Sequence, residues 1–213
     1  MATADKLTTV AENVPKVYNA GLASLVNAMS DGGTNFSGMF AYFTEASMND
    51  EETYNSYTLY INRPNFTTIP LIDTSKGTDF TYMFACCTSL TTIPQLDTSN
   101  GTNFSSMFSG CTSLTTIPQL DVSKGTSFSY MFGSSTTKGC TSLTTISFVE
   151  NCISRNISFK YCDALSHDSL VSILNGLKTV ASKKTCTLGA TNLAKLTNAE
   201  KAIATQKNWT LAS

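Results

Sequence analysis

A segment that repeats three times in the middle of the 213-residue chain constrains the fold most strongly. Its apolar residues recur every 24 positions, at Phe66, Leu90 and Leu114 and again at Met83, Met107 and Met131. The next equivalent leucine, Leu143, comes 29 positions after Leu114 because residues 134–138 form an insertion. A fixed period of about 20–50 residues is typical of stacked repeats, since one unit alone cannot bury its apolar face.

One unit, residues 87–111, predicts a local structure for all of them. Residues 90–93 form a short run rich in β-branched side chains that ends at Pro94, which is typical of a brief strand. Asp97 is expected to close a turn, and Gly101 to supply a positive φ there. The apolar residues that follow are spaced i, i+3, i+4 and i+7, as on one face of a helical turn: Phe104, Met107, Phe108 and Cys111. Each unit is therefore expected to contain a strand, a turn and a short helical segment.

The pattern MF-x-x-C-x-x-L-x-x-I occurs at Met83–Ile93 and again at Met107–Ile117. It resembles the BspA-like (bacterial surface protein type) leucine-rich repeat, from which this chain departs at Pro70, Pro94 and Pro118. The resemblance implies an α/β repeat fold: a leucine-rich-repeat-like solenoid with short parallel strands and short helical turns, closed by helical N- and C-terminal caps. It also implies a role in surface attachment, and it brings no catalytic residues.

Three regions are expected along the chain. They are an N-terminal helical cap or attachment segment at 1–33, the leucine-rich-repeat-like solenoid at 34–165 with an insertion at 44–64, and a C-terminal cap at 166–213. The first region has two interpretations, because stacked repeats need a cap but an exposed helix can also mediate assembly. Its segment KLTTVAENVPKVYNAG resembles the start of tail-region proteins in phages and prophages of Gram-positive bacteria.

Two features of the C-terminal region predict helix starts. Ser166 precedes an apolar stripe and is expected to be an N-cap, while Thr197 and Glu200 are spaced as a capping box. Asn208 is expected to end the last helix in a left-handed conformation, and Trp209 to cover the open end of the repeats.

Charge and hydrophobicity exclude several classes of partner. The formal net charge is −1 and only 14% of the residues are charged, which argues against nucleic acid and anionic membrane surfaces. No run of 18 apolar residues occurs, so no membrane insertion is expected. The N-terminus lacks the basic and apolar segments of a signal peptide, so we expect a chain made in the cytoplasm and not exported by the general pathway.

The residues offer no catalytic arrangement. Cys87, Cys111 and Cys140 share one repeat position and are expected to form a column of buried thiols, with disulfides along it less favoured and zinc not expected. The one histidine, His167, lies at a helix start with no nucleophile expected beside it. We therefore expect no enzyme, no catalytic residue, no metal and no cofactor.

Two stretches are candidate binding surfaces. The insertion combines the acidic residues 50–52 with Tyr54, Tyr57 and Tyr60, and exposed tyrosine is a favoured contact residue. The alternative is a strand over 57–61 whose tyrosines cover a sheet edge; a calcium site at 50–52 lacks EF-hand spacing. In the repeats, isoleucines that point inward would leave a neutral, hydroxyl-rich strip outside, for a glycan or protein partner or simply as a soluble face: Thr68, Thr92, Thr116 and Thr145.

These observations predict a non-enzymatic recognition or structural protein. The first hypothesis is a phage virion protein, tail- or capsid-associated, made in the host cytoplasm, that attaches to a host cell-surface protein or glycan. It would contact other virion proteins through the N-terminal helix and form a homo-oligomer, a trimer by analogy. The alternative is a bacterial adhesin, at the cell surface or extracellular, that binds a host protein or glycan. An enzyme would need carboxylates or histidine to converge in the 44–64 insertion.

Overall fold

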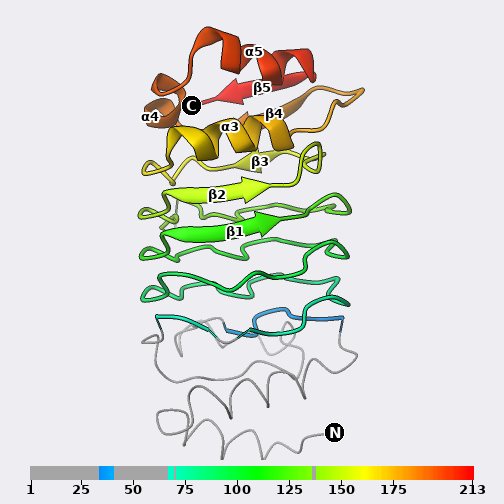
Figure 1. The fold of residues 1–213 in the computed structure, drawn as a ribbon, viewed down its shortest axis with the longest axis vertical. Helices are drawn as coiled ribbons and strands as arrows, with labels where there is room; N and C mark the ends of the chain where they lie inside the picture. The colour runs from blue at the N-terminus through cyan, green and yellow to red at the C-terminus, as the bar shows by residue number, and fades with distance from the viewer. Residues whose placement is uncertain (1–33, 41–66, 70, 136–137) are drawn as a thin grey trace, which may run out of the picture.

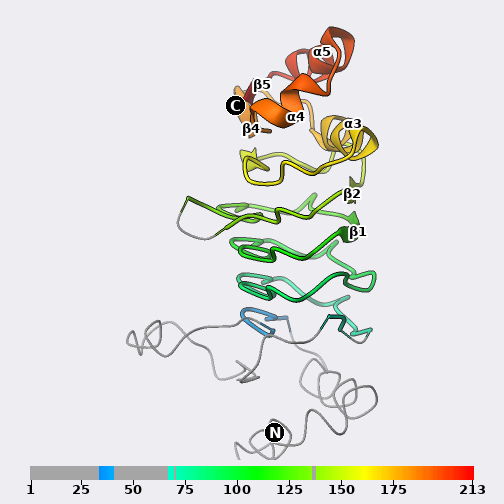
Figure 2. The same cartoon turned by 90° about the vertical axis from the view of Figure 1, so that its left-hand side faces the viewer.

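The computed structural model describes residues 34–40, 67–69, 71–135 and 138–213. The repeats lie one above another as successive layers of chain, and the helices gather at the C-terminal end (Figure 1). The view turned by 90° shows the same stack with the layers seen from the side (Figure 2). The N-terminal region 1–33 and the insertion 44–64 lie outside the described residues, and with them the expected N-terminal helix.

The strands form two small parallel sheets. Strands β1 (Thr116–Leu120) and β2 (Thr145–Phe148) pair in the first sheet. The second sheet has the order β3-β4-β5, with β3 (Ile157–Ser158), β4 (Lys184–Thr187) and β5 (Trp209–Ala212). In the described part of the earlier layers no strands pair, and the layers are joined by isolated parallel bridges, such as Thr92 to Thr116, and by single backbone hydrogen bonds. Three helices belong to the C-terminal region: α3 (His167–Gly176), α4 (Ala190–Ala194) and α5 (Asn198–Gln206).

The predicted α/β leucine-rich-repeat-like solenoid is wrong. The described residues contain two small parallel sheets, one of two strands and one of three. None of the described residues before α3 belongs to a helix. The expected helical turn fails at Ser106, whose φ of 55° is left-handed, and the equivalent residues Tyr82 and Tyr130 share this conformation. A left-handed residue cannot continue a right-handed helix. The apolar spacing that predicted a helix is produced by consecutive tight turns instead.

The backbone of these turns bonds in two directions. Three N–H groups donate to the carbonyl three residues earlier in the same layer, at 3.1–3.3 Å: those of Met107, Ser109 and Cys111. Three others donate to carbonyls of the next layer at 2.8–3.0 Å: those of Phe104, Ser106 and Phe108. Neighbouring layers are therefore held together by backbone hydrogen bonds without a continuous sheet.

The expected strand at 90–93 is also misplaced. In the segment 90–93 the structure has one isolated bridge, at Thr92, and no named strand. In the next layer β1 begins at Thr116 and continues through Pro118, where the register with β2 shifts between Ile117 and Leu120. Proline lacks an N–H for the ladder, so pairing is irregular there rather than stopped.

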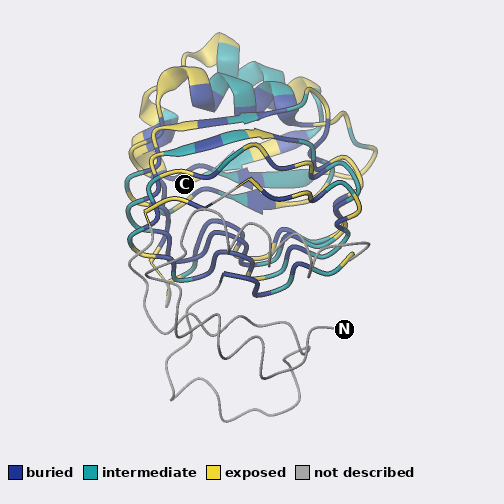
Figure 3. Ribbon diagram, turned by 60° about the horizontal axis from the view of Figure 1, so that its bottom comes forward, coloured by how far each residue is buried: buried dark blue, intermediate teal, exposed yellow. Residues whose placement is uncertain are grey.

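Two columns of stacked phenylalanine rings form the core. Neighbouring rings have centroids 5.4–5.9 Å apart, closing to 4.6 Å between Phe132 and Phe159. The first column is Phe36, Phe80, Phe104 and Phe128, and the second is Phe40, Phe84, Phe108, Phe132 and Phe159. Figure 3 shows the buried residues repeating from layer to layer. The burial of this aromatic area stabilises the stack, together with the Leu, Ile and Met side chains of the same core.

Gly101 has a different role from the expected one. Its φ is not among the positive values, so the predicted left-handed turn residue is wrong. A Cβ at this position would overlap the Phe104 ring, and the same holds at Gly77 and Gly125 with their own phenylalanines. The glycine is needed because the ring lies flat against the turn. Asp97 does close this turn as predicted, with its Oδ1 accepting from the Ser99 N–H at 3.0 Å.

The C-terminal helices begin as the sequence indicates. Ser166 caps α3 by accepting from the Ser169 N–H at 3.2 Å. Thr197 and Glu200 form the predicted capping box of α5. Asn208 has a φ of 66°, and Trp209 is buried with its Nε1 donating to the Lys178 carbonyl at 2.8 Å.

Candidate functional site

The threonine strip, defined as Thr92, Thr116 and Thr145, lies in register on three consecutive layers. Thr92 bridges to Thr116, and Thr116 pairs with Thr145 across β1 and β2. The isoleucines that follow them in the sequence are at most 4% exposed, whereas Thr92 and Thr145 are exposed and Thr116 is half-buried. The sequence therefore identified the outward side of these layers. Thr68 is exposed as well, but no bridge places it in the column.

A second column of threonines, which sequence reasoning did not single out, joins the layers. The hydroxyls of Thr91, Thr115 and Thr144 donate to the carbonyl oxygens of Thr67, Thr91 and Thr115, at 2.9, 3.0 and 3.1 Å. The hydroxyls of the threonine strip make longer contacts, 3.5 Å from the Thr92 Oγ1 to the Ile93 carbonyl and 3.4 Å between the hydroxyls of Thr144 and Thr145. In these three Thr-Thr pairs the first hydroxyl bonds to the neighbouring layer, whereas the second donates to no carbonyl of another layer among the described residues. Exposure does not separate the two positions, since Thr115 and Thr144 are exposed and Thr116 is half-buried.

The other predicted contact residues cannot be placed. Tyr54, Tyr57 and Tyr60, together with the acidic residues 50–52, lie outside the described residues. Their role in binding stays a prediction.

The cysteine column is structural. Cys87, Cys111 and Cys140 are buried with free thiols, and their Sγ atoms donate to the carbonyls of Phe40, Phe84 and Phe108 at 3.0–3.2 Å. Burial raises the pKa of Cys87 and of Cys111. For Cys140 a hydrogen bond with Cys162 is the largest cause of its raised pKa, followed by burial. Neutral thiols of this kind bind neither metals nor electrophiles readily.

His167 joins two helices. Its Nε2 lies 2.8 Å from Glu200 Oε1, and its Nδ1 lies 3.8 Å from Asp168 Oδ1. The carboxylate of Glu200 belongs to the capping box of α5, so the contact ties the start of α3 to the start of α5. Among the described residues, no group of three or more His, Cys, Asp or Glu side chains is arranged to hold a metal ion. Nor does that part of the chain contain a helix long and apolar enough to span a membrane.

A hollow of about 770 Å³, the basic groove, opens where the repeats meet the C-terminal region. It is lined by segments 126–130 and 155–161 and by residues of β4, far apart in the sequence. Its charged lining residues are Arg155, Lys160 and Lys184, its aromatic ones are Phe128, Tyr130 and Tyr161, and the others are mostly Ser and Thr. The available signal was weak, because only the rise in basic residues after position 154 distinguishes this region from the sparsely charged repeats.

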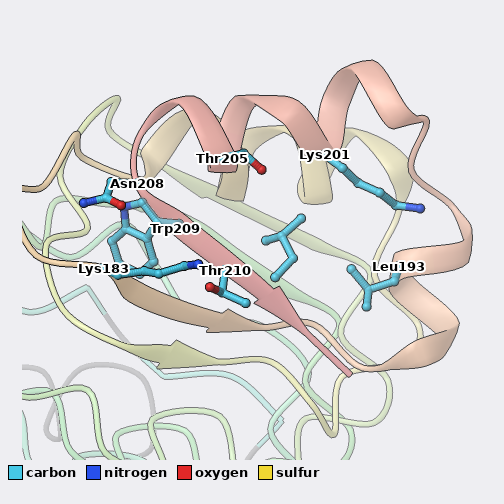
Figure 4. A pocket seen from close by; sticks show the side chains of 8 residues that line it. Lys183, Leu193, Lys201, Thr205, Asn208, Trp209 and Thr210 are labelled. Atoms are coloured by element: carbon cyan, nitrogen blue, oxygen red, sulfur yellow. The ribbon is translucent and has the colours of Figure 1, made fainter.

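A second cavity of about 480 Å³ lies between α5 and β5 (Figure 4). Lys183, Lys201 and Leu193 surround it together with Trp209 of β5. The indole is 2% exposed and its N–H is already bonded within the protein, so the aromatic group serves packing. The cavity offers a partner fewer polar groups than the basic groove does.

Stacked layers with repeated outward side chains define a repeat protein, and its candidate sites are open surfaces. A family model described as "Mycoplasma protein of unknown function, DUF285" matches residues 34–167, more than half of the chain. The chain belongs to this family. No curated protein matches the chain, and no solved structure does. The comparisons leave the resemblance to BspA-like repeats and to phage tail-region proteins as predictions.

Proposed function

We propose that this chain is a non-enzymatic recognition protein that uses the threonine strip to bind a protein or glycan on a cell surface. The observation that carries the proposal is the alignment of Thr92, Thr116 and Thr145 on consecutive layers, each followed by a buried isoleucine. Such a column offers several weak hydrogen-bonding groups at a regular spacing to one partner. Repeated weak contacts gain strength when one ligand engages them together.

In this proposal the protein is part of a phage virion and attaches it to a host cell. The resemblance of KLTTVAENVPKVYNAG to tail-region proteins supports this setting, with the N-terminal region as the contact to other virion proteins. The repeat resemblance supports the alternative setting, a bacterial cell-surface adhesin. Both settings use the same surface, so the location of the protein separates them.

The location is tested by mass spectrometry of particles released after prophage induction of the source bacterium, compared with washed cell envelopes. Peptides of this chain enriched in the particle fraction are the expected result. Peptides confined to the envelopes would overturn the virion setting and leave the adhesin.

The binding surface is tested with the purified chain and fluorescently labelled target cells. The triple variant Thr92→Val, Thr116→Val and Thr145→Val removes the three hydroxyls with little change of shape, and we expect cell binding to fall. The control removes three exposed hydroxyls elsewhere: Thr179→Val, Thr191→Val and Thr205→Val. Equal binding by both triple variants and the unmodified chain would show that the strip is only a solvated face.

A further inference from the structure

We propose that the basic groove is a binding site for an acidic saccharide, a sugar chain that carries carboxylate groups. The site is separate from the threonine strip, and the inference does not depend on the proposed function. Three observations carry it: an interruption in the bonding between layers, the balance of charge in the groove, and the aromatic and hydroxyl groups that line it.

The hydrogen bonding between layers stops at the groove. In three successive layers, the two stacked phenylalanines and the left-handed residue between them donate their N–H groups to the next layer: Phe36, Gly38, Phe40, Phe80, Tyr82, Phe84, Phe104, Ser106 and Phe108. The equivalent N–H groups of Phe128, Tyr130 and Phe132 have no acceptor within the described part of the chain. Phe128 and Tyr130 line the groove, which therefore contains backbone donors for which the described residues provide no acceptor.

The sequence explains this interruption. The first phenylalanine column ends at Phe128. Arg155 lies seven residues before Cys162, as Phe104 lies seven residues before Cys111, so an arginine takes the repeat position of the phenylalanine. The layer after Phe128 thus loses an aromatic stacking partner at the same place where it gains a cation.

The charge of the groove is positive. Arg155 and Lys160 are exposed and Lys184 is half-buried, and all three line the hollow. No Asp or Glu is among its described lining residues. This balance stands out in a chain with a formal net charge of −1. Guanidinium and ammonium groups beside unpaired backbone N–H groups favour a carboxylate, with which they form charge-assisted hydrogen bonds.

The size and remaining lining indicate a sugar rather than a small ion. A volume of about 770 Å³ is within the range of sites for whole organic ligands, roughly 300–1,000 Å³. Tyr130 is 63% exposed and Tyr161 half-buried, so two aromatic rings are available at the surface of the groove. Tyrosine combines a flat apolar face with a hydroxyl, and serine and threonine hydroxyls complete the lining. A chain of hydroxylated rings bearing carboxylates matches these groups.

The experiment measures binding of a hyaluronan tetrasaccharide to the full chain by isothermal titration calorimetry. Neutral chitotetraose and sodium acetate are the comparison ligands. We expect the tetrasaccharide to bind and its affinity to fall as the salt concentration is raised. Both comparison ligands should bind at least about tenfold more weakly, because that is the loss expected when about one charge-assisted hydrogen bond is missing. The double variant Arg155→Gln and Lys184→Gln should lose affinity by about tenfold or more for the same reason.

The matched control is the double variant Lys76→Gln and Lys178→Gln, which removes the same net charge from exposed positions outside the groove. Its affinity for the tetrasaccharide should stay unchanged. Tyr130→Ala, an exposed substitution with little effect on folding, should weaken the tetrasaccharide but not acetate. Thermal unfolding verifies that each variant is folded.

Three results would overturn the assignment. If chitotetraose binds as tightly as the hyaluronan tetrasaccharide, the carboxylates of the ligand are not required. If acetate binds as tightly, the sugar rings are not required. Equal loss in the groove variant and the Lys76/Lys178 control would make the effect a property of net charge. Loss of cell binding in the threonine-strip variant alone would leave this site untouched, so the two proposals fail separately.

Discussion

The N–H and the side-chain hydroxyl of Thr115 both donate to one oxygen, the carbonyl of Thr91, at 2.9 and 3.0 Å. The same double contact recurs from Thr91 to Thr67 and from Thr144 to Thr115. Each of these threonines therefore bonds its layer to the preceding layer twice. The following threonine in each pair makes no such double contact; the Thr145 N–H also donates to the Thr115 carbonyl, at 3.1 Å, but its hydroxyl does not.

This difference predicts unequal effects of the same substitution at neighbouring positions. Thr115→Val should lower the free energy of unfolding by about 0.5–1 kcal/mol, because it removes a hydroxyl hydrogen bond between layers. Thr116→Val should change it by less than about 0.5 kcal/mol. Urea denaturation followed by circular dichroism measures both. Equal losses at the two positions would contradict the assigned roles.

The thiols predict a single reactive cysteine in the native protein. Six of the seven cysteines are buried, and Cys86 is half-buried. Burial raises the pKa of Cys186 to about 12 and also raises that of Cys86, so even the accessible thiol should react slowly at neutral pH. Titration with Ellman's reagent should show one equivalent in buffer and seven in denaturant.

The control for this titration is Cys86→Ser, which should abolish the reaction in buffer and leave six equivalents in denaturant. Rapid reaction of a second thiol in buffer would mean that a layer opens in the native state.

Gly110 should be hard to replace. Its φ is 79°, and a Cβ there would lie 3.2 Å from the Cys86 Cα of the preceding layer. Gly110→Ala should therefore cost at least about 1 kcal/mol, combining left-handed strain with a close contact to backbone. Ser113→Ala, in the same layer at a half-buried position, should stay within about 0.5 kcal/mol. The midpoint of thermal unfolding ranks the two variants, and a harmless Gly110→Ala would show that the layers can move apart there.

Glu200 predicts a pH-dependent contribution to stability. The Thr197 backbone N–H, then the Thr197 hydroxyl and His167 hold the pKa of Glu200 below its ordinary value of 4.5. Because the folded pKa is the lower one, the contribution is present above the ordinary value and is lost as the pH falls through the folded pKa. Glu200→Gln should lower the Tm at pH 7, and the difference from the unmodified chain should shrink below about pH 4.

Glu150→Gln serves as the comparison, because Glu150 is an exposed carboxylate outside the capping box. Its Tm should follow that of the unmodified chain at each pH. A Glu200→Gln difference that is constant with pH would assign the effect to shape rather than charge.

The sequence predicted the repeat period, the inward isoleucines and the helix starts at Ser166 and Thr197, because each depends on residues close together in the sequence. Its failure at residues 104–111 has a specific cause. The spacing i, i+3, i+4, i+7 occurs in a helix, but two tight turns with a left-handed residue between them place the same side chains inside. The first repeat contained the signal, since Gly38, with a φ of 65°, takes the position of Tyr82 and Ser106.

The basic groove was beyond prediction for another reason. Segments 126–130 and 155–161 lie together because they belong to neighbouring layers of the stack, and the repeat position of a phenylalanine is filled there by Arg155. The distance between β4 and residue 130 depends on how many layers lie between them, and that number is set by how the whole chain stacks. No local pattern of residues carries that information.

The double contact of Thr115 has a consequence for how such chains change in evolution. Donor and acceptor occupy the same position in consecutive repeats. A repeat in the middle of the stack therefore donates to the repeat before it and accepts from the repeat after it through the same residue. Duplication or deletion of a whole 24-residue unit restores the same bonds at the new junction. Recombination can therefore change the height of the stack by one layer at a time while the contacts between layers stay the same. The distance from one end of the stack to a surface at the other end changes in the same equal steps.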